Sequence, residues 1–341
     1  MLAEFCREFK NNTALEDAIS LYEETVVELA PRDERPDDWA ATQHLLGNAL
    51  GLLGQRQRAT FMLERAVRVF ENLLLARTRE QAPLEWATTQ DNYGNVLGTL
   101  GQRRGDTGML EKSVAAFENA LRERSQDQVP MDWAATQNNL GTALQVLGQC
   151  EKDPRLLKKS VEAYKNALKE WTRERVPMSW ATTFNNLGTV LRLLGETRKG
   201  PRTLEQSVAA FQNALAERTR ERVPQEWAMT QNNLGAALQS LGKRQDDPKF
   251  LGEAVTAYEN ALQEVTRERT AMGWVMTLGN LGAARMILAE MTGNTDIALM
   301  ALNDFDEVMK YFQEASHAQY MELAEEQRKN AQALVEALNE Q

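Results

Sequence analysis

Histidine and cysteine are scarce in this chain of 341 residues, which holds only two of each. A histidine-based triad or a multi-histidine metal site would have to draw on His44 and His317, which lie far apart in the sequence. Cys6 and Cys150 cannot build a disulfide framework in a chain of this length, which is typical of a reducing compartment. HExxH motifs, CxxC pairs and EF-hand loops are also missing. We therefore expect no enzyme activity, no metal site and no cofactor.

Long apolar runs and a basic stripe are missing as well. Nowhere do 18 apolar residues follow one another, and charges interrupt residues 1–10 every few positions, so we expect neither a membrane span nor a signal peptide, and a cytoplasmic location. The formal net charge is -10, and residues 290–341 hold eleven acids and three bases, which places -8 of it there. Because a duplex-binding protein needs a basic surface, we expect neither nucleic acid nor membrane as a partner.

The tryptophans of this sequence recur at a regular interval. Six of the seven tryptophans are each 47 residues apart, and each is followed by threonine three residues later and by glycine eight residues later. The six are Trp39, Trp86, Trp133, Trp180, Trp227 and Trp274. A sequence period of this length indicates stacked copies of one structural unit. Positions within a unit are numbered below by their offset from its tryptophan.

Each unit carries two segments with helical periodicity. In helix A, which begins near the tryptophan, apolar or semi-apolar residues at offsets 0, 3, 7, 10, 11 and 14 fall on one side of a helix, so we expect the indole ring in the core. Helix B follows, as in 110–124, where apolar residues again recur at helical spacing. Proline three residues before the tryptophan marks a helix start. Glycine at offset 8 predicts close approach of helix B, and glycine at offset 15 predicts the end of helix A.

The motifs "NNLGTAL" in helix A and "AAFENAL" in helix B resemble the tetratricopeptide repeat, in a long-period, 47-residue bacterial form. The resemblance covers nearly the whole chain and implies an all-α fold, a right-handed α-solenoid of antiparallel helix pairs. We divide the chain into a truncated first repeat (1–38), six repeats (39–320) and a C-terminal capping helix (321–341). The last repeat departs from the others, because Arg285 replaces a leucine and Ala289 replaces the glycine at offset 15. A cap there would present a wettable face.

The face of helix A opposite its core side holds offsets 2, 5, 6, 9, 12 and 13, which in this family line a concave groove. Amides recur at offsets 5 and 6, and a primary amide can both donate to and accept from a peptide backbone. The resemblance implies peptide binding by Asn92, Asn138, Asn139, Asn185, Asn186, Asn232, Asn233, Asn280 and the one base on this face, Arg192. The alternative is that the amides bond to neighbouring helices and hold repeat against repeat.

This face becomes more apolar toward the C-terminus. At offset 2, alanine and threonine give way to Met229 and Met276. Methionines there can form an adaptable binding patch, or they can be covered by the C-terminal helix. The sequence leaves both interpretations open.

The expected function is that of a protein–protein interaction scaffold that binds a protein or peptide segment in the groove of A helices. The alternative is the sensor or regulatory arm of a larger bacterial signalling protein, whose caspase-like protease or signalling ATPase domain is absent from this chain. The chain opens in the middle of a repeat, which suggests a piece of a longer array and allows self-association through the truncated first repeat.

Overall fold

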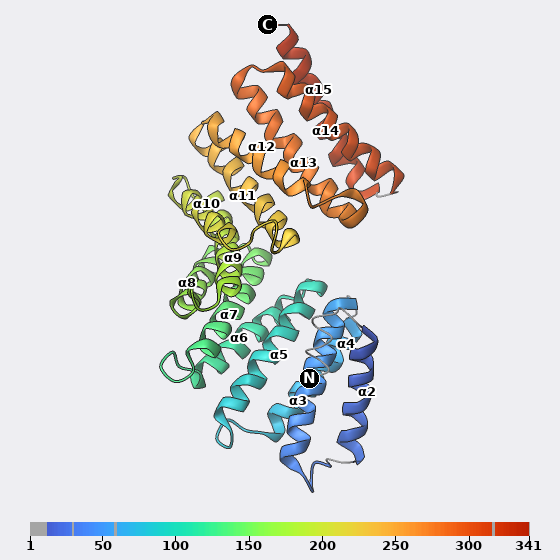
Figure 1. Cartoon of the computed structure of the whole chain (residues 1–341), viewed down its shortest axis with the longest axis vertical. Coiled ribbons are helices and arrows are strands. Elements are labelled where there is room, and N and C mark those ends of the chain that lie inside the picture. Colours follow the sequence, from blue (N-terminus) through green and yellow to red (C-terminus); the bar gives the residue numbers. More distant parts are fainter. Residues whose placement is uncertain (1–11, 29–30, 58–59, 316–317, 341) are drawn as a thin grey trace. The chain divides into compact units, whose positions relative to one another are not determined.

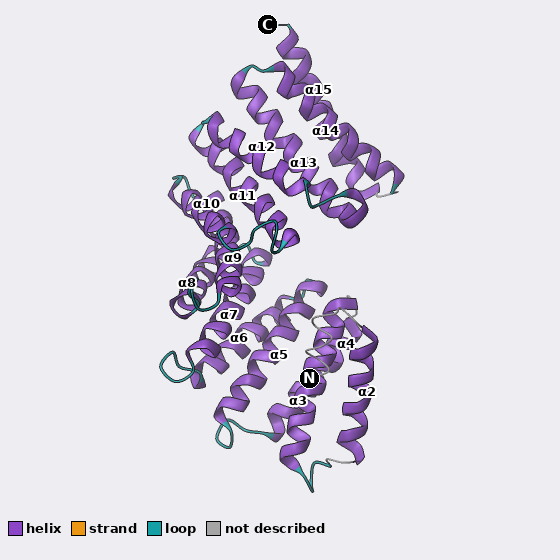
Figure 2. Cartoon of the chain, in the orientation of Figure 1, coloured by secondary structure: helices purple, strands orange, loops and turns teal. Residues whose placement is uncertain are grey.

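A computed structural model describes residues 12–28, 31–57, 60–315 and 318–340. Over these ranges all regular structure is helical and no strand occurs (Figures 1 and 2). The chain divides into two compact units, Met1–Trp171 and Thr172–Gln341, which are described separately. The predicted last turns of a truncated helix A fall in residues 1–11, outside the described ranges.

The first unit is a series of helices in which each packs on the next along the chain (Figure 1). Its helices are α2 (Asn12–Glu28), α3 (Pro36–Gln57), α4 (Thr60–Ala76), α5 (Pro83–Arg104), α6 (Thr107–Glu123), α7 (Pro130–Cys150) and α8 (Pro154–Glu170). The A helices are α3, α5 and α7, and each packs most closely on the B helix that follows it. This confirms the expected helical hairpin.

The second unit repeats this arrangement and adds one helix at its end. Its helices are α9 (Pro177–Glu196), α10 (Arg202–Leu215), α11 (Pro224–Gln245), α12 (Pro248–Leu262), α13 (Arg267–Thr292), α14 (Thr295–Glu314) and α15 (Ala318–Asn339). The A helices are α9, α11 and α13. Helix α15 packs on α14 and α13, with Ala324, Ala331 and Val335 buried.

The helix starts follow from the sequence. Five A helices begin at a proline, whose missing N–H and fixed φ suit the first turn. Helices α6, α8 and α12 are capped by Asp106, Asp153 and Asp247, whose side chains accept hydrogen bonds from backbone N–H groups of the first turn.

Glycine at offset 8 allows helix B to approach helix A, as predicted. A methyl group added at Gly141 would lie 2.7 Å from a ring carbon of Tyr164, and one added at Gly94 would lie 2.9 Å from Phe117. Ser160 fixes the same contact, because its hydroxyl donates to the Gly141 carbonyl at 2.6 Å. The aromatic ring of helix B therefore fills the space that a side chain at offset 8 would need.

The prediction that glycine at offset 15 ends helix A is wrong. Gly148 and Gly195 are buried inside α7 and α9, which continue to Cys150 and Glu196. A methyl group at Gly195 would lie 2.6 Å from Leu204 of the following helix B. These glycines are thus a second point of close approach between the helices of a pair.

The expectation that the indole rings lie in the core is only partly met. Trp39 is buried, but the other tryptophans of the series remain half-exposed. Each stands at the start of helix A, and Trp180, Trp227 and Trp274 each have the arginine seven residues earlier over the ring. Arg220 lies 5.8 Å from the ring centre of Trp227, and Arg173 lies 5.9 Å from that of Trp180. A guanidinium group covers an aromatic face where a second layer of apolar side chains would otherwise be needed.

Candidate functional site

The face of the A helices at offsets 2, 6 and 9 is at least partly accessible in both units, whereas at offset 5 Asp91 and the predicted binding residue Asn185 are buried. Asn92 and Asn139 in the first unit and Asn233 and Asn280 in the second are half-buried. The amide row is therefore neither fully exposed nor sealed inside the wall.

The amides at offset 6 are used between successive A helices. Four of the five reach back to the residue at offset 5 of the previous A helix, 48 positions earlier in the chain. Asn92 Nδ2 lies 2.9 Å from His44 Nε2, and the Nδ2 groups of Asn139, Asn233 and Asn280 donate to Asp91 Oδ2 at 3.2 Å, Asn185 Oδ1 at 3.2 Å and Asn232 Oδ1 at 3.5 Å. The row thus ties neighbouring repeats together, which was the alternative left open by the sequence.

The remaining predicted residues lie on the same face. Asn186 Oδ1 accepts from Asn185 Nδ2 at 3.4 Å on α9, and Asn138 is half-buried on α7. Arg192 forms an ion pair with Glu196 one turn along α9. A primary amide has two N–H groups, and the bond to the neighbouring helix uses only one of them. The other N–H remains available to a peptide, so peptide binding by these nine residues stays a prediction.

Sequence reasoning missed two buried arginines that enter this face from the ends of the B helices. Arg124 donates to Thr88 Oγ1 on α5 at 2.8 Å and to Thr136 Oγ1 on α7 at 2.7 Å. Arg218 makes the equivalent bonds to Thr182 at 2.9 Å and Thr230 at 3.0 Å. Each guanidinium bridges two successive A helices. The two arginines are two full periods apart, and each has threonine at offset 2 of the A helix before it and at offset 3 of the A helix after it. This repeated pattern is the signal that could have identified them.

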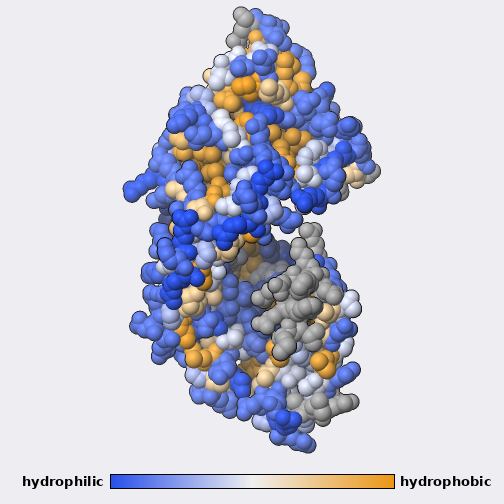
Figure 3. Space-filling model, viewed as in Figure 1, coloured by the Kyte–Doolittle hydropathy of each residue, from blue (hydrophilic) through white to orange (hydrophobic). Residues whose placement is uncertain are grey.

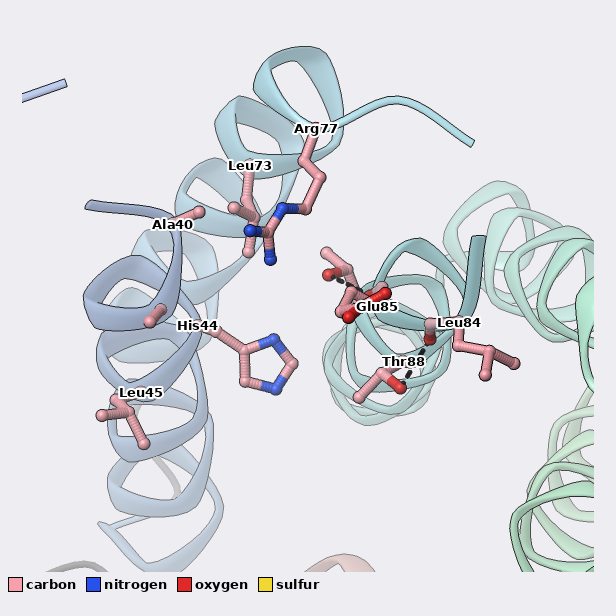
Figure 4. Close-up of a pocket in the computed structure, with 10 residues that line it drawn as sticks. Ala40, His44, Leu45, Leu73, Arg77, Leu84, Glu85 and Thr88 are labelled. Atoms are coloured by element: carbon pink, nitrogen blue, oxygen red, sulfur yellow. Dashed lines mark hydrogen bonds between the residues drawn. The ribbon is translucent and has the colours of Figure 1, made fainter. Parts of the chain in front are cut away.

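Arg77 occupies the same position one repeat earlier but lies beside an open pocket. Helix α3 has Ala41 where α5 has Thr88, so the hydroxyl that would accept from the guanidinium on that side is missing. Arg77 Nη2 instead donates to Asp37 Oδ1 at 2.7 Å, and Figure 4 shows the guanidinium and the His44 ring extending into the space between α3 and α5. The pocket measures about 510 Å³ and is lined by Ala40, Ala41, His44, Leu45, Leu73, Arg77, Leu84, Glu85, Thr88 and Thr89.

Burial and the nearby positive charges favour the neutral form of the histidine in this pocket. Burial lowers the pKa of His44, and the positive charges of Arg77 and Arg124 lower it further. Burial raises the pKa of Asp91, although Arg124, at 3.6 Å from its carboxylate, favours the charged form. The pocket therefore offers one guanidinium donor, one carboxylate from Glu85 and a neutral ring among apolar side chains.

A second pocket lies on the corresponding face of the second unit, between α13, α14 and α15. It measures about 420 Å³ and its lining is mainly apolar: Met272, Val275, Met276, Gly279, Asn280, Ala283, Phe305, Val308, Phe312, Tyr320, Leu323, Ala324 and Gln327. Met276 is 63% exposed, so α15 does not cover the methionines at offset 2. The structure thus decides between the two interpretations left open for these residues.

Comparisons with known proteins agree with this geometry. The sequence profile of the family described as tetratricopeptide repeat matches residues 133–170 and 227–265, each of which spans one helix A and the following helix B. The chain thus contains tetratricopeptide repeats. The two matched repeats begin two periods apart, at Trp133 and Trp227.

Solved structures share its fold at low sequence identity. The C-terminal part of a TPR repeat-containing protein from Cytophaga hutchinsonii is 13% identical, with 91% of this chain and 93% of that chain covered and a TM-score of 0.51. The apo form of RapI is also 13% identical, with 98% and 97% covered and a TM-score of 0.50. No curated protein sequence matches the chain.

The described residues show neither a metal site nor a membrane-spanning helix. No group of three or more His, Cys, Asp or Glu side chains is placed to hold a metal ion. Among the described helices, none combines the length and the apolar composition needed to span a membrane.

Proposed function

We propose that this tetratricopeptide-repeat protein is an interaction scaffold that holds a segment of a partner protein along the exposed face of its A helices. The observation that carries the proposal is the pocket between α3 and α5, which opens on that face and combines apolar walls with a few polar groups. A scaffold role also agrees with the repeat architecture, since successive repeats extend one surface.

The chemistry of this pocket suits one residue of a peptide. A peptide unit offers a carbonyl that can accept from the Arg77 guanidinium and an N–H that can donate to the Glu85 carboxylate. An aliphatic side chain of the same segment would fit between Leu45, Leu73 and Leu84. The second N–H of each amide in the row would then pair with backbone carbonyls on either side.

The test is capture of partner proteins from the source cell by the immobilised chain. Leu84→Asp places a charge in the apolar lining at a side chain that is already 44% exposed, so the fold should persist. We expect capture to fall by about tenfold or more, which corresponds to roughly 1.4 kcal/mol of binding free energy.

Leu75→Asp is the matched control. Leu75 belongs to the same unit, is 78% exposed on α4 and does not line the pocket. Circular dichroism should show the same helical content for both variants. Equal capture by the two variants would contradict the proposal that this pocket binds the partner.

A further inference from the structure

A row of large apolar side chains crosses the second unit on the face of its A helices. Met229 on α11, Met276 on α13 and Leu323 on α15 are spaced 47 residues apart and are 47%, 63% and 59% exposed. Leu323 therefore continues the row at offset 2 onto the last helix. Isolated apolar residues at a surface are ordinary, but an aligned row on three helices that stand beside one another is typical of an interaction surface.

The row borders the pocket between α13, α14 and α15. Met276 and Leu323 both line this pocket, together with Phe305 and Phe312 of α14. Figure 3 shows apolar atoms reaching the surface among these C-terminal helices. The pocket of about 420 Å³ can hold one large side chain of a bound segment, and the methionines can adapt to its shape.

The charges beside the row favour a basic partner. Glu322 and Glu326 flank Leu323, are exposed and make no ion pair within the part of the chain that the structure describes. The bases on the same helix are neutralised, because Arg328 pairs with Asp306 and Lys329 pairs with Glu325. The net charge of -8 over residues 290–341 extends this acidic character beyond the pocket.

The spacing of the row distinguishes a bound helix from a bound strand. Packed helices lie about 8–10 Å apart, so successive side chains of the row are separated by about that distance. Seven residues of an α-helix advance about 10.5 Å, whereas side chains on one face of a strand repeat every 6.6 Å or so. A helix with apolar residues at i, i+7 and i+14 can therefore contact each member of the row, and intermediate residues at i+3 or i+4 can contact the pocket.

We infer that the row Met229–Met276–Leu323 and the adjoining pocket dock a basic amphipathic helix of a partner protein. The inference rests on the proposed function, since it names the kind of segment that this face binds in the second unit. The apolar side of the helix would contact the row and the pocket, and its lysine or arginine side chains would face Glu322 and Glu326.

The experiment uses the full chain and fluorescein-labelled synthetic peptides of about 18 residues, which span roughly 27 Å as a helix. The first peptide has leucine at i, i+3, i+7, i+10 and i+14 and lysine at most other positions. A second peptide has the same composition in scrambled order, a third has glutamate in place of lysine, and a fourth has a central proline that prevents a continuous helix. Fluorescence anisotropy measures the dissociation constants.

We expect the first peptide to bind about tenfold or more tightly than each of the other three. Met276→Asp and Leu323→Asp should each weaken its binding by about tenfold, and Met300→Asp should leave it unchanged. Met300 is 52% exposed on α14 and does not line the pocket, so it matches the tested methionine in type and exposure. The double variant Glu322→Gln with Glu326→Gln should weaken binding and reduce its dependence on salt.

Binding of the scrambled peptide or of the proline peptide as tight as that of the designed peptide would overturn the inference of a helical partner. A self-associated chain that becomes monomeric in Leu323→Asp, measured by light scattering, would instead assign the row to a second copy and would also overturn it. Either result leaves the proposed function standing if capture by the first unit still depends on Leu84. Loss of that dependence with unchanged peptide binding would contradict only the proposed function.

Discussion

At the scale of single residues, the contacts that define this repeat involve small side chains and paired charges. Gly141 is buried because the Tyr164 ring occupies the space beside its Cα atom. In the last repeat, Arg285 takes the place of a leucine, and it is neutralised by Asp304 at 2.7 Å and Glu259 at 2.6 Å. Because an unpaired buried charge is costly, the substitution at Arg285 depends on the acid at Asp304, where the earlier repeats have alanine or valine.

Gly141→Ala should lower the free energy of unfolding by about 1–2 kcal/mol, because its methyl group would lie 2.7 Å from the Tyr164 ring and overpack the hairpin. Urea denaturation followed by circular dichroism measures the change. Gly252→Ala in α12 is the control, since no atom beyond its own stretch of helix backbone lies within 4 Å of its added methyl group. That control should raise stability by about 0.5–1 kcal/mol through helix propensity. A Gly141→Ala variant as stable as the parent would show that the ring contact is not close.

His44 predicts a pH dependence of stability. Burial and the nearby Arg77 and Arg124 lower its pKa in the folded chain, so below about pH 6.5 the unfolded chain takes up a proton that the folded chain does not. The free energy of unfolding should therefore decrease as the pH falls from 7.5 to 5.5. The measurement is the difference in the free energy of unfolding between the parent and His44→Gln over this range, because the remaining titratable groups affect both proteins alike. A constant difference would contradict the lowered pKa.

At the scale of helices, each A helix is held to the next by polar groups as well as by apolar packing. Offsets 5 and 6 supply the amide row, and Arg124 and Arg218 bridge threonines on successive A helices. The backbone geometry just before an A helix is the same even in the repeat that lacks the proline. Within α13, Thr270 has φ -148° and ψ 65°, close to the values of Val223 before Pro224, although alanine follows it.

Asn233→Ala and Asn280→Ala should each destabilise the second unit by about 0.5–1.5 kcal/mol, because each removes a hydrogen bond between A helices. Thermal or urea unfolding of the full chain measures the effect. Asn213→Ala on α10 is the control, since this asparagine is exposed and its removal should change stability by less than about 0.5 kcal/mol. A loss of unfolding free energy no larger than that of the control would show that the amides do not stabilise the contact between A helices.

At the scale of the whole molecule, the chain consists of two units whose apolar cores are each built from consecutive helices. In the second unit one continuous cluster of buried side chains runs from Leu204 to Ala324. In a repeat array each element contacts only its neighbours, so stability depends on intrinsic repeat terms and on the interfaces between adjacent repeats. A unit with a complete cluster should therefore fold without the other.

Residues 172–341 expressed alone should remain helical and unfold cooperatively in urea, with a slope of about 1–3 kcal/mol per molar. The control fragment begins at residue 248 and lacks α9, α10 and α11, which removes Phe211, Leu238 and Leu241 from the same cluster. We expect the shorter fragment to lose most of its helical circular dichroism signal. An unfolded 172–341 fragment would show that the first unit is needed for the second to fold.

Much of the fold could be predicted from periodicity, because each repeat restates the same local rules. The prolines predicted where five of the A helices begin, and glycine at offset 8 predicted the contact between paired helices. The role of glycine at offset 15 was misjudged, since a buried glycine and a helix-ending glycine look alike in sequence. The burial of the tryptophans was overestimated because the arginines that cover Trp180, Trp227 and Trp274 precede helix A and are not part of its helical pattern.

The proposed binding face could likewise be predicted only in part. Its position on the A helices followed from the 3.6-residue period, and the sequence supplied the two possible uses of the amides. Whether Asn233 bonds to Asn185, or whether Met276 is covered by α15, depends on how one repeat is placed against another. No pattern within one helix contains that information.

The sequence by itself determined the helical hairpin, its 47-residue period and the residues on each helix face, because these depend on backbone preferences and side-chain spacing along one segment. Only the tertiary structure decided that the amides join neighbouring A helices, that Ala41 leaves a pocket beside Arg77 and that the methionines reach solvent. These outcomes depend on distances between side chains far apart in the chain, which are set by the packing of whole helices.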